Sequence, residues 1–231
     1  MGGRNAVRIP WKLVGAPRTG YACGVGSTSL ARALEAMASM EKGKPYSLRP
    51  EDAKRQLAEE LARLCREAGV APVVIGGLAV NHHGYMRVTA DVDILVSRRD
   101  AVPLYRRLRS EPGWKRYAEG FKNTIVGVGL DICVEGERTA PGSTEEFPDP
   151  NDLRTLPVKP LPVLSLSELI ALKVMSGRAR DDADVVELVK RHLSRATSLR
   201  AAASKRLRTT RARAHLKALV VRARAEAARR R

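Results

Sequence analysis

The segment Asp-Val-Asp-Ile-Leu-Val at residues 91–96 constrains the fold more than any other part of the chain. Side chains of a β-strand alternate between the two faces of a sheet, so Asp91 and Asp93 share one face while the valines and the isoleucine share the other. Two adjacent carboxylates repel each other, which lowers stability unless a cation such as Mg²⁺ neutralises them. The segment therefore predicts a strand with one apolar face and one face that suits a hard cation.

A third carboxylate stands in a later segment with the same alternation, Leu130-Asp131-Ile132-Cys133-Val134. Three carboxylates on neighbouring strands can hold two metal ions about 3.5–4 Å apart, an arrangement that stabilises the attacking and leaving oxygens of phosphoryl transfer. We therefore predict that Asp91, Asp93 and Asp131 converge as catalytic and metal-binding residues, with two Mg²⁺ ions as cofactors. A solvated strand end is the alternative interpretation of the first two acids.

Two glycines, Gly76 and Gly77, follow a short apolar strand expected at Val73–Ile75 and precede a brief helix expected at Leu78–His83. Backbone N–H groups at such a strand-to-helix turn can face phosphate groups. A tight turn without a ligand explains the pair equally well. The order of motifs, two glycines followed by the acidic pair and then by a later acid, favours the functional interpretation.

The formal charge of +17 is distributed unevenly along the chain. Residues 195–231 contain 13 Lys or Arg against one acid, which gives +12, and residues 1–40 contain five against one, which gives +4. Residues 41–194 therefore carry the remaining +1. We predict a basic, disordered extension at 1–40, a nearly neutral folded domain at 41–194, and an Arg-rich tail at 195–231 that is helical or disordered.

The chain lacks an apolar run near the roughly 18 residues that a membrane-spanning helix requires, so we expect no membrane partner. It also shows no secretory signal pattern, and its three cysteines are not clustered. These features predict a reducing compartment, the cytoplasm. Met37 and Met40 stand directly before the first patterned segment, so the translation start is open between them and Met1.

Periodicity and turn residues predict most of the remaining elements. We expect helices at Pro50–Ala68, from near Asp100, at Ser165–Met175 and at Asp181–Leu193, and strands at Lys115–Ala118 and Thr124–Val134. Pro103 is expected in the first turn of its helix, where proline is tolerated. Ser165 and Glu168 have the spacing of a capping box. The intervening loop at 135–162 contains six prolines and is expected to form a lid or rim.

Together these motifs resemble the nucleotidyltransferase superfamily whose palm domain is of the DNA polymerase β type. The matching residues are Gly76-Gly77-Leu78-Ala79-Val80, His83-Gly84, Arg87, Thr89, Asp91-Val92-Asp93-Ile94-Leu95 and Leu130-Asp131-Ile132, with supporting segments at 147–150, 163–173 and 180–184. The resemblance covers roughly residues 50–193 and is greatest to small bacterial proteins near the abortive-infection toxin and minimal nucleotidyltransferase groups. It implies an α/β (α+β) fold in which helices pack on one face of a mixed β-sheet.

The resemblance also implies roles for individual residues. Gly76 and Gly77 would hold a nucleoside triphosphate, and Asp91 and Asp93 would bind both metal ions. Asp131 would bind the catalytic metal ion and help to deprotonate an acceptor hydroxyl.

Three further nucleotide-binding residues are expected. Arg87 and Thr89 precede the metal-binding strand and are expected to contact phosphate or base. Lys173 matches a lysine that neutralises phosphate in related toxins, and an exposed helix lysine is the alternative.

Two more features bear on the site. Asp181 and Asp184 share one helix face, where we expect them to pair with Arg178 or Arg180 rather than to assist nucleotide binding. Leu78 stands where aminoglycoside and lincosamide nucleotidyltransferases tend to have tryptophan, which argues against an antibiotic acceptor.

The function expected from the resemblance is Mg²⁺-dependent transfer of a nucleoside monophosphate from a nucleoside triphosphate to a hydroxyl of RNA, tRNA or protein, with release of pyrophosphate. The alternative is a catalytically silent nucleotidyltransferase fold that serves as a binding or antitoxin-like module with a cognate toxin or antitoxin partner. The basic tail is then either an RNA-binding arm or a solvated extension.

Overall fold

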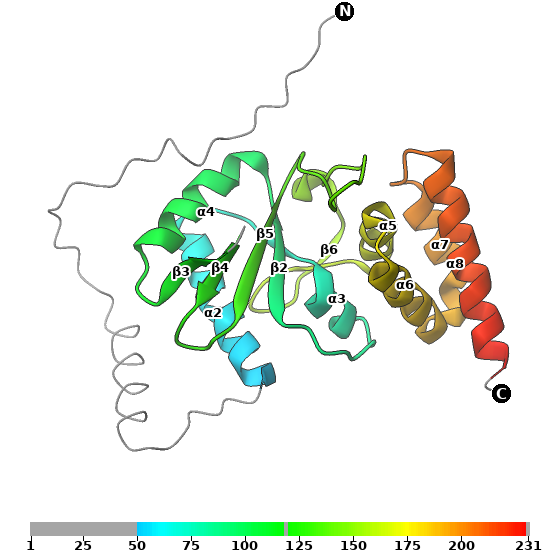
Figure 1. Ribbon diagram of the computed structural model, residues 1–231, viewed down its shortest axis with the longest axis horizontal. Coiled ribbons are helices and arrows are strands. Elements are labelled where there is room, and N and C mark those ends of the chain that lie inside the picture. The colour runs from blue at the N-terminus through cyan, green and yellow to red at the C-terminus, as the bar shows by residue number, and fades with distance from the viewer. Residues whose placement is uncertain (1–49, 118–119, 230–231) are drawn as a thin grey trace, which may run out of the picture. The chain divides into compact units, whose positions relative to one another are not determined.

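A single mixed β-sheet runs through the part of the chain that the computed structural model describes, residues 50–117 and 120–229. Its seven strands there lie in the order β3-β4-β5-β2-β1-β7-β6 (Figure 1). Their bounds are β1 Val73–Val74, β2 Asp91–Val96, β3 Trp114–Tyr117, β4 Gly120–Asn123, β5 Gly129–Val134, β6 Thr155–Leu156 and β7 Val163–Leu164. The β2–β5 and β1–β7 pairs are parallel and the other pairs are antiparallel. The predicted mixed α/β architecture is confirmed.

Helices cover this sheet and extend beyond it. Their bounds are α2 Pro50–Glu67, α3 Gly76–His82, α4 Arg98–Ser110, α5 Leu166–Ser176, α6 Ala179–Arg191, α7 Ala196–Ser204 and α8 Thr210–Ala228. Helices α2 and α4 pack against each other and against β2 and β3, respectively. Helices α5 to α8 pack on one another beside the sheet and share its hydrophobic core (Figure 1).

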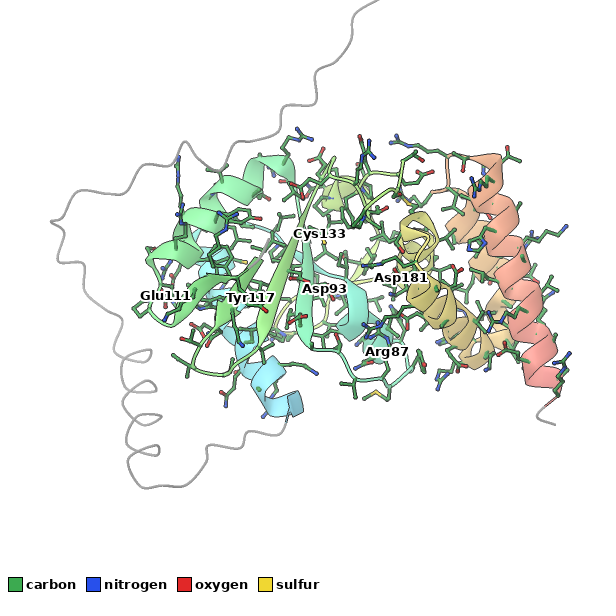
Figure 2. The ribbon with its side chains drawn as sticks, viewed as in Figure 1. Arg87, Asp93, Glu111, Tyr117, Cys133 and Asp181 are labelled. Atoms are coloured by element: carbon green, nitrogen blue, oxygen red, sulfur yellow. The ribbon has the colours of Figure 1, made fainter. Side chains whose placement is uncertain are left out.

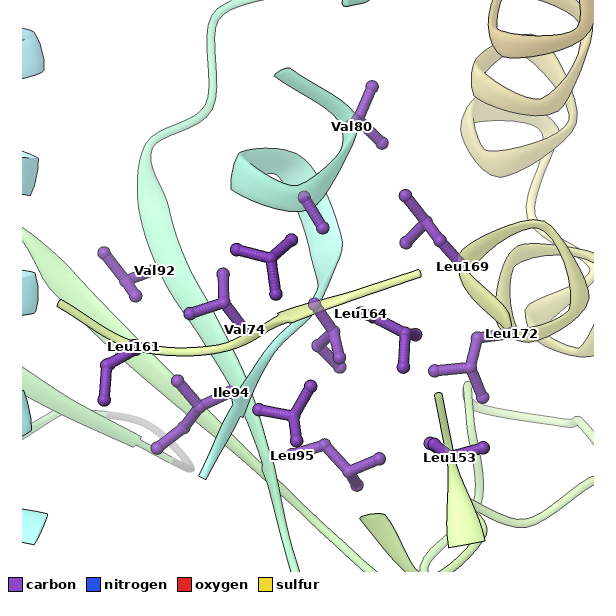
Figure 3. Close-up of a cluster of buried hydrophobic side chains, with 14 of the residues drawn as sticks. Val74, Val80, Val92, Ile94, Leu95, Leu153, Leu161, Leu164, Leu169 and Leu172 are labelled. Carbon is purple, nitrogen blue, oxygen red and sulfur yellow. The ribbon is translucent and has the colours of Figure 1, made fainter. Parts of the chain in front are cut away.

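The two faces of β2 have different surroundings. Val92 and Ile94 are completely buried, whereas Asp91 and Asp93 on the opposite face are half-buried. Figure 2 shows Asp93 on β2 and Cys133 on the neighbouring β5. Farther along the acidic face the sheet is covered, because Leu95 lies within a buried apolar cluster to which α5 contributes Leu169 and Leu172 (Figure 3). Apolar packing therefore leaves only the beginning of β2 open on its acidic face.

The strand predicted at Thr124–Val134 is confirmed for Gly129–Val134, but its beginning is wrong, because a turn follows Asn123. Backbone N–H groups of Ile125 and Val126 donate to the side-chain oxygen of Asn123, and Gly127 adopts φ +72°. Asparagine side chains that bond to the following backbone stabilise turns in this way. The chain thus reverses between β4 and β5 and adds an antiparallel hairpin to the sheet.

Two local predictions about helix beginnings are also wrong. Helix α4 begins at Arg98, after Ser97 accepts a hydrogen bond from the Asp100 N–H, so Pro103 lies inside the helix rather than in its first turn. Helix α5 follows Ser165, but the Ser165 hydroxyl makes no capping bond. The predicted partner Glu168 is instead buried and ion-paired with Arg206 at 2.8 Å.

The chain beyond residue 195 is helical as far as the structure describes it. Leu199 of α7 and Leu216 and Leu219 of α8 are buried, and α8 packs on α6 while α7 packs on α5. The compact unit that contains the sheet spans Ser47–Arg231, so these helices share its core, and the extension predicted at 1–40 lies outside the described residues. Among the described helices, we find none that combines the length and the apolar character needed to cross a membrane.

Candidate active site

The three carboxylates that the sequence singled out rise from one face of the sheet. Asp93 of β2 pairs directly with Asp131 of the parallel strand β5, and Asp91 pairs with Gly129. Paired residues on adjacent strands point to the same face, and neighbouring strands lie about 4.8 Å apart. Asp131 is exposed, and a Cβ at Gly129 would lie 2.2 Å from the Asp91 carboxylate, so the Asp91 side chain leans over β5. The alternation in the sequence thus correctly placed these acids on a common face.

The two glycines lie in the first turn of α3, rather than before the helix as predicted, and their lack of side chains leaves room for Asp93 and Thr89. A Cβ at Gly76 would lie 1.9 Å from Oδ2 of Asp93, and Gly76 has φ +59°, which favours glycine. A Cβ at Gly77 would lie 2.5 Å from Oγ1 of Thr89. The Gly77 N–H donates to Asp93 Oδ2 at 3.2 Å. In this structure the turn therefore binds a carboxylate of the protein itself at the position where phosphate was predicted.

Burial dominates the ionisation of Asp93. It raises the pKa of this carboxyl above its ordinary value, and the charge of Asp91 acts in the same direction. The Gly77 N–H and the nearby cations Lys173 and Arg178 oppose the shift without cancelling it. Asp93 is thus a carboxylate whose negative charge is incompletely compensated, as expected where a cation is to bind.

Lys173 lies at the centre of a buried ion-pair cluster on α5 and α6. Its Nζ is 2.6 Å from Asp181 Oδ1 and 2.7 Å from Asp184 Oδ2. Arg178 Nε donates to Asp181 Oδ2 at 2.6 Å, and the Ser176 hydroxyl donates to the same carboxylate. The predicted pairing with Arg178 or Arg180 is confirmed for Asp181, which binds Arg178, but is wrong for Asp184, which binds Lys173 and Arg87. The interpretation of Lys173 as an exposed helix lysine is also wrong, because this lysine is buried. Ser176 had no distinguishing signal in the sequence.

Arg87 and Thr89 connect the loop before β2 to its surroundings. Arg87 makes a bidentate pair with Asp184, with Nε at 2.7 Å from Oδ1 and Nη2 at 2.9 Å from Oδ2. Thr89 is buried, and its hydroxyl donates to the Asp91 carbonyl at 3.2 Å. Both predicted nucleotide-binding residues therefore have partners within the protein. Asp184 lies on α6, so the two parallel hydrogen bonds of the Arg87 guanidinium join this loop to that helix.

Cationic side chains thus lie close to the acidic face of the sheet, where Lys173 and Arg178 act on the charge of Asp93. Three cations, Arg87, Lys173 and Arg178, surround the two carboxylates of Asp181 and Asp184. The cluster carries a formal surplus of one positive charge beside an acidic surface. Such a juxtaposition suits a ligand that combines a divalent cation with phosphate groups.

The metal-binding geometry itself is not preformed in the part of the chain that the structure describes. No three His, Cys, Asp or Glu side chains there are gathered closely enough to hold an ion. Cys133 shares the acidic face, but burial and the neighbouring charges of Asp93 and Asp131 raise its pKa to about 12. It is therefore a protonated thiol at neutral pH and a poor nucleophile or metal ligand.

Comparisons with known proteins give distant structural likenesses only, to several solved chains. No protein-family model and no curated protein matches this chain. A similar solved structure is the crystal structure of ANT(2")-Ia in complex with adenylyl-2"-tobramycin, at 14% sequence identity and a TM-score of 0.37, covering 75% of this chain and 98% of the other. A likeness at this TM-score carries no conclusion about substrate or activity.

Proposed function

We propose that this protein is a Mg²⁺-dependent nucleotidyltransferase that moves a nucleoside monophosphate from a nucleoside triphosphate to a hydroxyl acceptor. The observation that carries the proposal is the direct pairing of Asp93 with Asp131 on an open sheet face, with Asp91 beside them and a cationic cluster opposite. Phosphoryl transfer depends mainly on positioning and on charge stabilisation, and these two groups of side chains provide both.

The donor set fits Mg²⁺ in its chemistry, because hard cations prefer carboxylate oxygens. Asp91, Asp93 and Asp131 would hold two ions, and bound Mg²⁺ supplies neutralisation of charge on the attacking and leaving oxygens. The Asp93 carboxylate now accepts a hydrogen bond from the Gly77 N–H. In this proposal it turns away from that N–H on metal binding, which leaves the turn at Gly76 and Gly77 free to bind the triphosphate.

The chain's own residues then have distinct tasks. Asp131 is the exposed member of the three acids, and it accepts the proton of the acceptor hydroxyl. The hydroxyl oxygen forms a bond to the α-phosphorus while the bond from that phosphorus to the bridging oxygen breaks, and pyrophosphate leaves. Arg178, whose side chain is 62% exposed, offers N–H donors to the phosphates, and buried Lys173 stabilises them electrostatically.

Titration calorimetry with Mg²⁺ and each nucleoside triphosphate, together with transfer of a labelled nucleotide, tests this function. We expect Asp131→Asn to lose transfer by at least about 100-fold, because general base catalysis contributes roughly 10²–10⁴-fold. Glu59→Gln is the matched control, since Glu59 is an exposed acid on α2, which packs on the other side of the sheet. Equal activity of wild type and Asp131→Asn would contradict the proposed role.

A catalytically silent binding module is the second candidate, and one observation favours it. Gly77, Arg87 and Lys173, three of the groups predicted to hold a nucleotide, are hydrogen-bonded or ion-paired within the protein. In this case the fold would recognise a cognate toxin or antitoxin protein. Absence of binding of every nucleoside triphosphate by the unmutated protein, with or without Mg²⁺, would support this candidate over the enzyme.

The acceptor in our proposal is RNA or tRNA, with protein as the alternative. Helices α7 and α8 and their flanking residues expose a strongly basic surface, formed by Arg195, Lys205, Arg208, Arg211, Arg213, Lys217, Arg222, Arg224 and Arg229. The acid on these two helices is Glu226, and it is paired with Lys190 and Arg222. Such a surface favours a polyanion through release of counterions, so affinity should fall steeply with salt. A cytoplasmic location stays a prediction.

A further inference from the structure

The acidic face of the sheet continues past the candidate active site onto a basic edge. Lys115 of β3 pairs with Lys122 of β4, Lys122 pairs with Gly129 of β5, and Gly129 pairs with Asp91 of β2. Directly paired residues of adjacent strands share a face, so this row crosses four strands on one side of the sheet. Lys122 is therefore separated from the predicted metal-binding residue Asp91 by Gly129 alone, and Lys115 lies one strand farther out.

A second row runs parallel to the first. Tyr117 of β3 pairs with Gly120 of β4, and a Cβ at Gly120 would lie 3.2 Å from the Asp131 carboxylate. Asp131 in turn pairs with Asp93. Gly120 has no side chain to separate the tyrosine from the acid. Figure 2 shows Tyr117 on the sheet beyond the strands that carry Asp93 and Cys133.

Tyr117, Lys115 and Lys122 are exposed to solvent, and the pairing of the two lysines is unfavourable for stability. Tyr117 is 65% exposed, and the ammonium of Lys122 lies 5.8 Å from the centre of its ring. Lys115 and Lys122 are both exposed and directly opposite each other, and like charges in this position are destabilising. Within residues 50–117 and 120–229 neither lysine forms an ion pair, so a bound anion would relieve the repulsion.

We propose that Lys115, Tyr117 and Lys122 bind the single-stranded end of an RNA acceptor, a surface that rests on the proposed function and extends its site. The lysines contact backbone phosphates, and a base stacks on the exposed tyrosine ring. An exposed aromatic ring flanked by cations is the arrangement by which proteins bind single strands without strong sequence preference. The terminal hydroxyl of a strand held there lies beside Asp131, across the side-chain-free position of Gly120.

Fluorescence anisotropy with a labelled single-stranded RNA of about 12 nucleotides tests this surface in the full-length protein, without nucleotide or Mg²⁺. We expect Tyr117→Ala to weaken binding roughly 10-fold, because base–aromatic stacking is lost, and Tyr117→Phe to retain affinity. Lys122→Ala should weaken binding and reduce the slope of log affinity against log salt by about 0.7. Lys159→Ala, an exposed lysine in the loop between β6 and β7, should change neither quantity.

A duplex RNA of the same sequence distinguishes this surface from general phosphate attraction. It should be bound equally by wild type and Tyr117→Ala, because its bases are not free to stack. Unchanged single-strand affinity in Tyr117→Ala, or equal losses in Tyr117→Ala and Tyr117→Phe, would overturn the proposal. So would loss of binding only with Lys217→Ala on α8. Thermal unfolding of each variant verifies that it folds.

The outcome is separable from that of the proposed function. RNA binding that depends on Tyr117 in a protein that binds no nucleoside triphosphate would refute the enzyme and retain the RNA surface. The opposite result is nucleotide binding and transfer to an acceptor other than RNA, with no effect of Tyr117→Ala on RNA binding. It would retain the enzyme and refute the RNA surface.

Discussion

The carboxylate of Asp93 lies against Gly76, so closely that a Cβ at Gly76 would be 1.9 Å from Oδ2 of Asp93. This contact joins two motifs that are 16 residues apart, because the same carboxylate oxygen accepts a hydrogen bond from the Gly77 N–H. The two glycines and the acidic strand are therefore one structural unit. A ligand that moves Asp93 also changes the availability of the Gly77 amide.

Gly76→Ala should be strongly destabilising, because the new methyl group would have to displace the Asp93 side chain at a backbone angle that L-residues rarely adopt. Gly142→Ala is the matched control. Gly142 has φ +79°, similar to the +59° of Gly76, but a Cβ there has no neighbour within 4 Å. We expect backbone strain to lower the free energy of unfolding by about 1–3 kcal/mol in the control, and we expect a larger decrease in Gly76→Ala. Urea unfolding curves that coincide for both variants would contradict the close packing.

Asp93→Asn should stabilise the protein at neutral pH. Because burial raises the pKa of Asp93 in the folded state, the ionised form opposes folding. The wild type therefore loses stability as pH rises from the ordinary carboxyl range, near 4, through the raised pKa. The variant should be the more stable protein at pH 7, and the advantage should shrink as pH falls through the raised pKa and be lost below about 4. Unfolding curves measured across this range, with Glu59→Gln as the control for loss of an exposed acid, test the sign.

Lys173→Met should destabilise the fold, independently of any effect on nucleotide transfer. The variant leaves the buried carboxylates of Asp181 and Asp184 without their shared cation, and removing one partner of a buried ion pair typically costs about 3–5 kcal/mol. The second substitution Asp181→Asn in the same chain should recover part of this loss. Denaturant unfolding of the single and double variants measures the coupling. If the two substitutions changed the free energy of unfolding additively, Lys173 and Asp181 would not interact.

Leu216→Ala should destabilise the whole unit, because α8 is part of its core. Leu216 is fully buried, and replacing such a leucine by alanine typically costs about 2–5 kcal/mol. Val221 lies on the same helix but is 57% exposed, so Val221→Ala should change stability by less than about 0.5 kcal/mol. A single cooperative transition, shifted in the first variant only, is the expected result. A separate early transition in Leu216→Ala would show that α7 and α8 fold independently.

Removal of the chain after Leu193 should for the same reason give a poorly folded protein. The net charge along the sequence distinguishes this segment from the nearly neutral domain before it. The truncation would nevertheless expose the faces of α5 and α6 on which α7 and α8 pack. It would also leave buried Glu168 without Arg206. We expect increased binding of a hydrophobic dye and a loss of cooperative unfolding. A soluble, cooperatively unfolding fragment would contradict the shared core.

The sequence by itself determined the features that depend on spacing along the chain. Alternation in 91–96 predicted the strand and the common face of its two acids, and helical periodicity predicted α2. The sequence also placed Arg178 and Arg180 near Asp181 as possible partners, and the structure pairs Asp181 with Arg178, which lies just before the first residue of α6.

Only the tertiary structure decided which distant groups meet. Topology brings β5 beside β2 in a register that places Asp131 opposite Asp93. Arg206 reaches Glu168 across 38 residues and displaces the local capping bond that Ser165 and Glu168 would otherwise make. Arg87 finds Asp184 across 97 residues. Such partners are set by the three-dimensional path of the chain, and where a buried charge needs compensation a distant counter-ion prevails over a weaker local hydrogen bond.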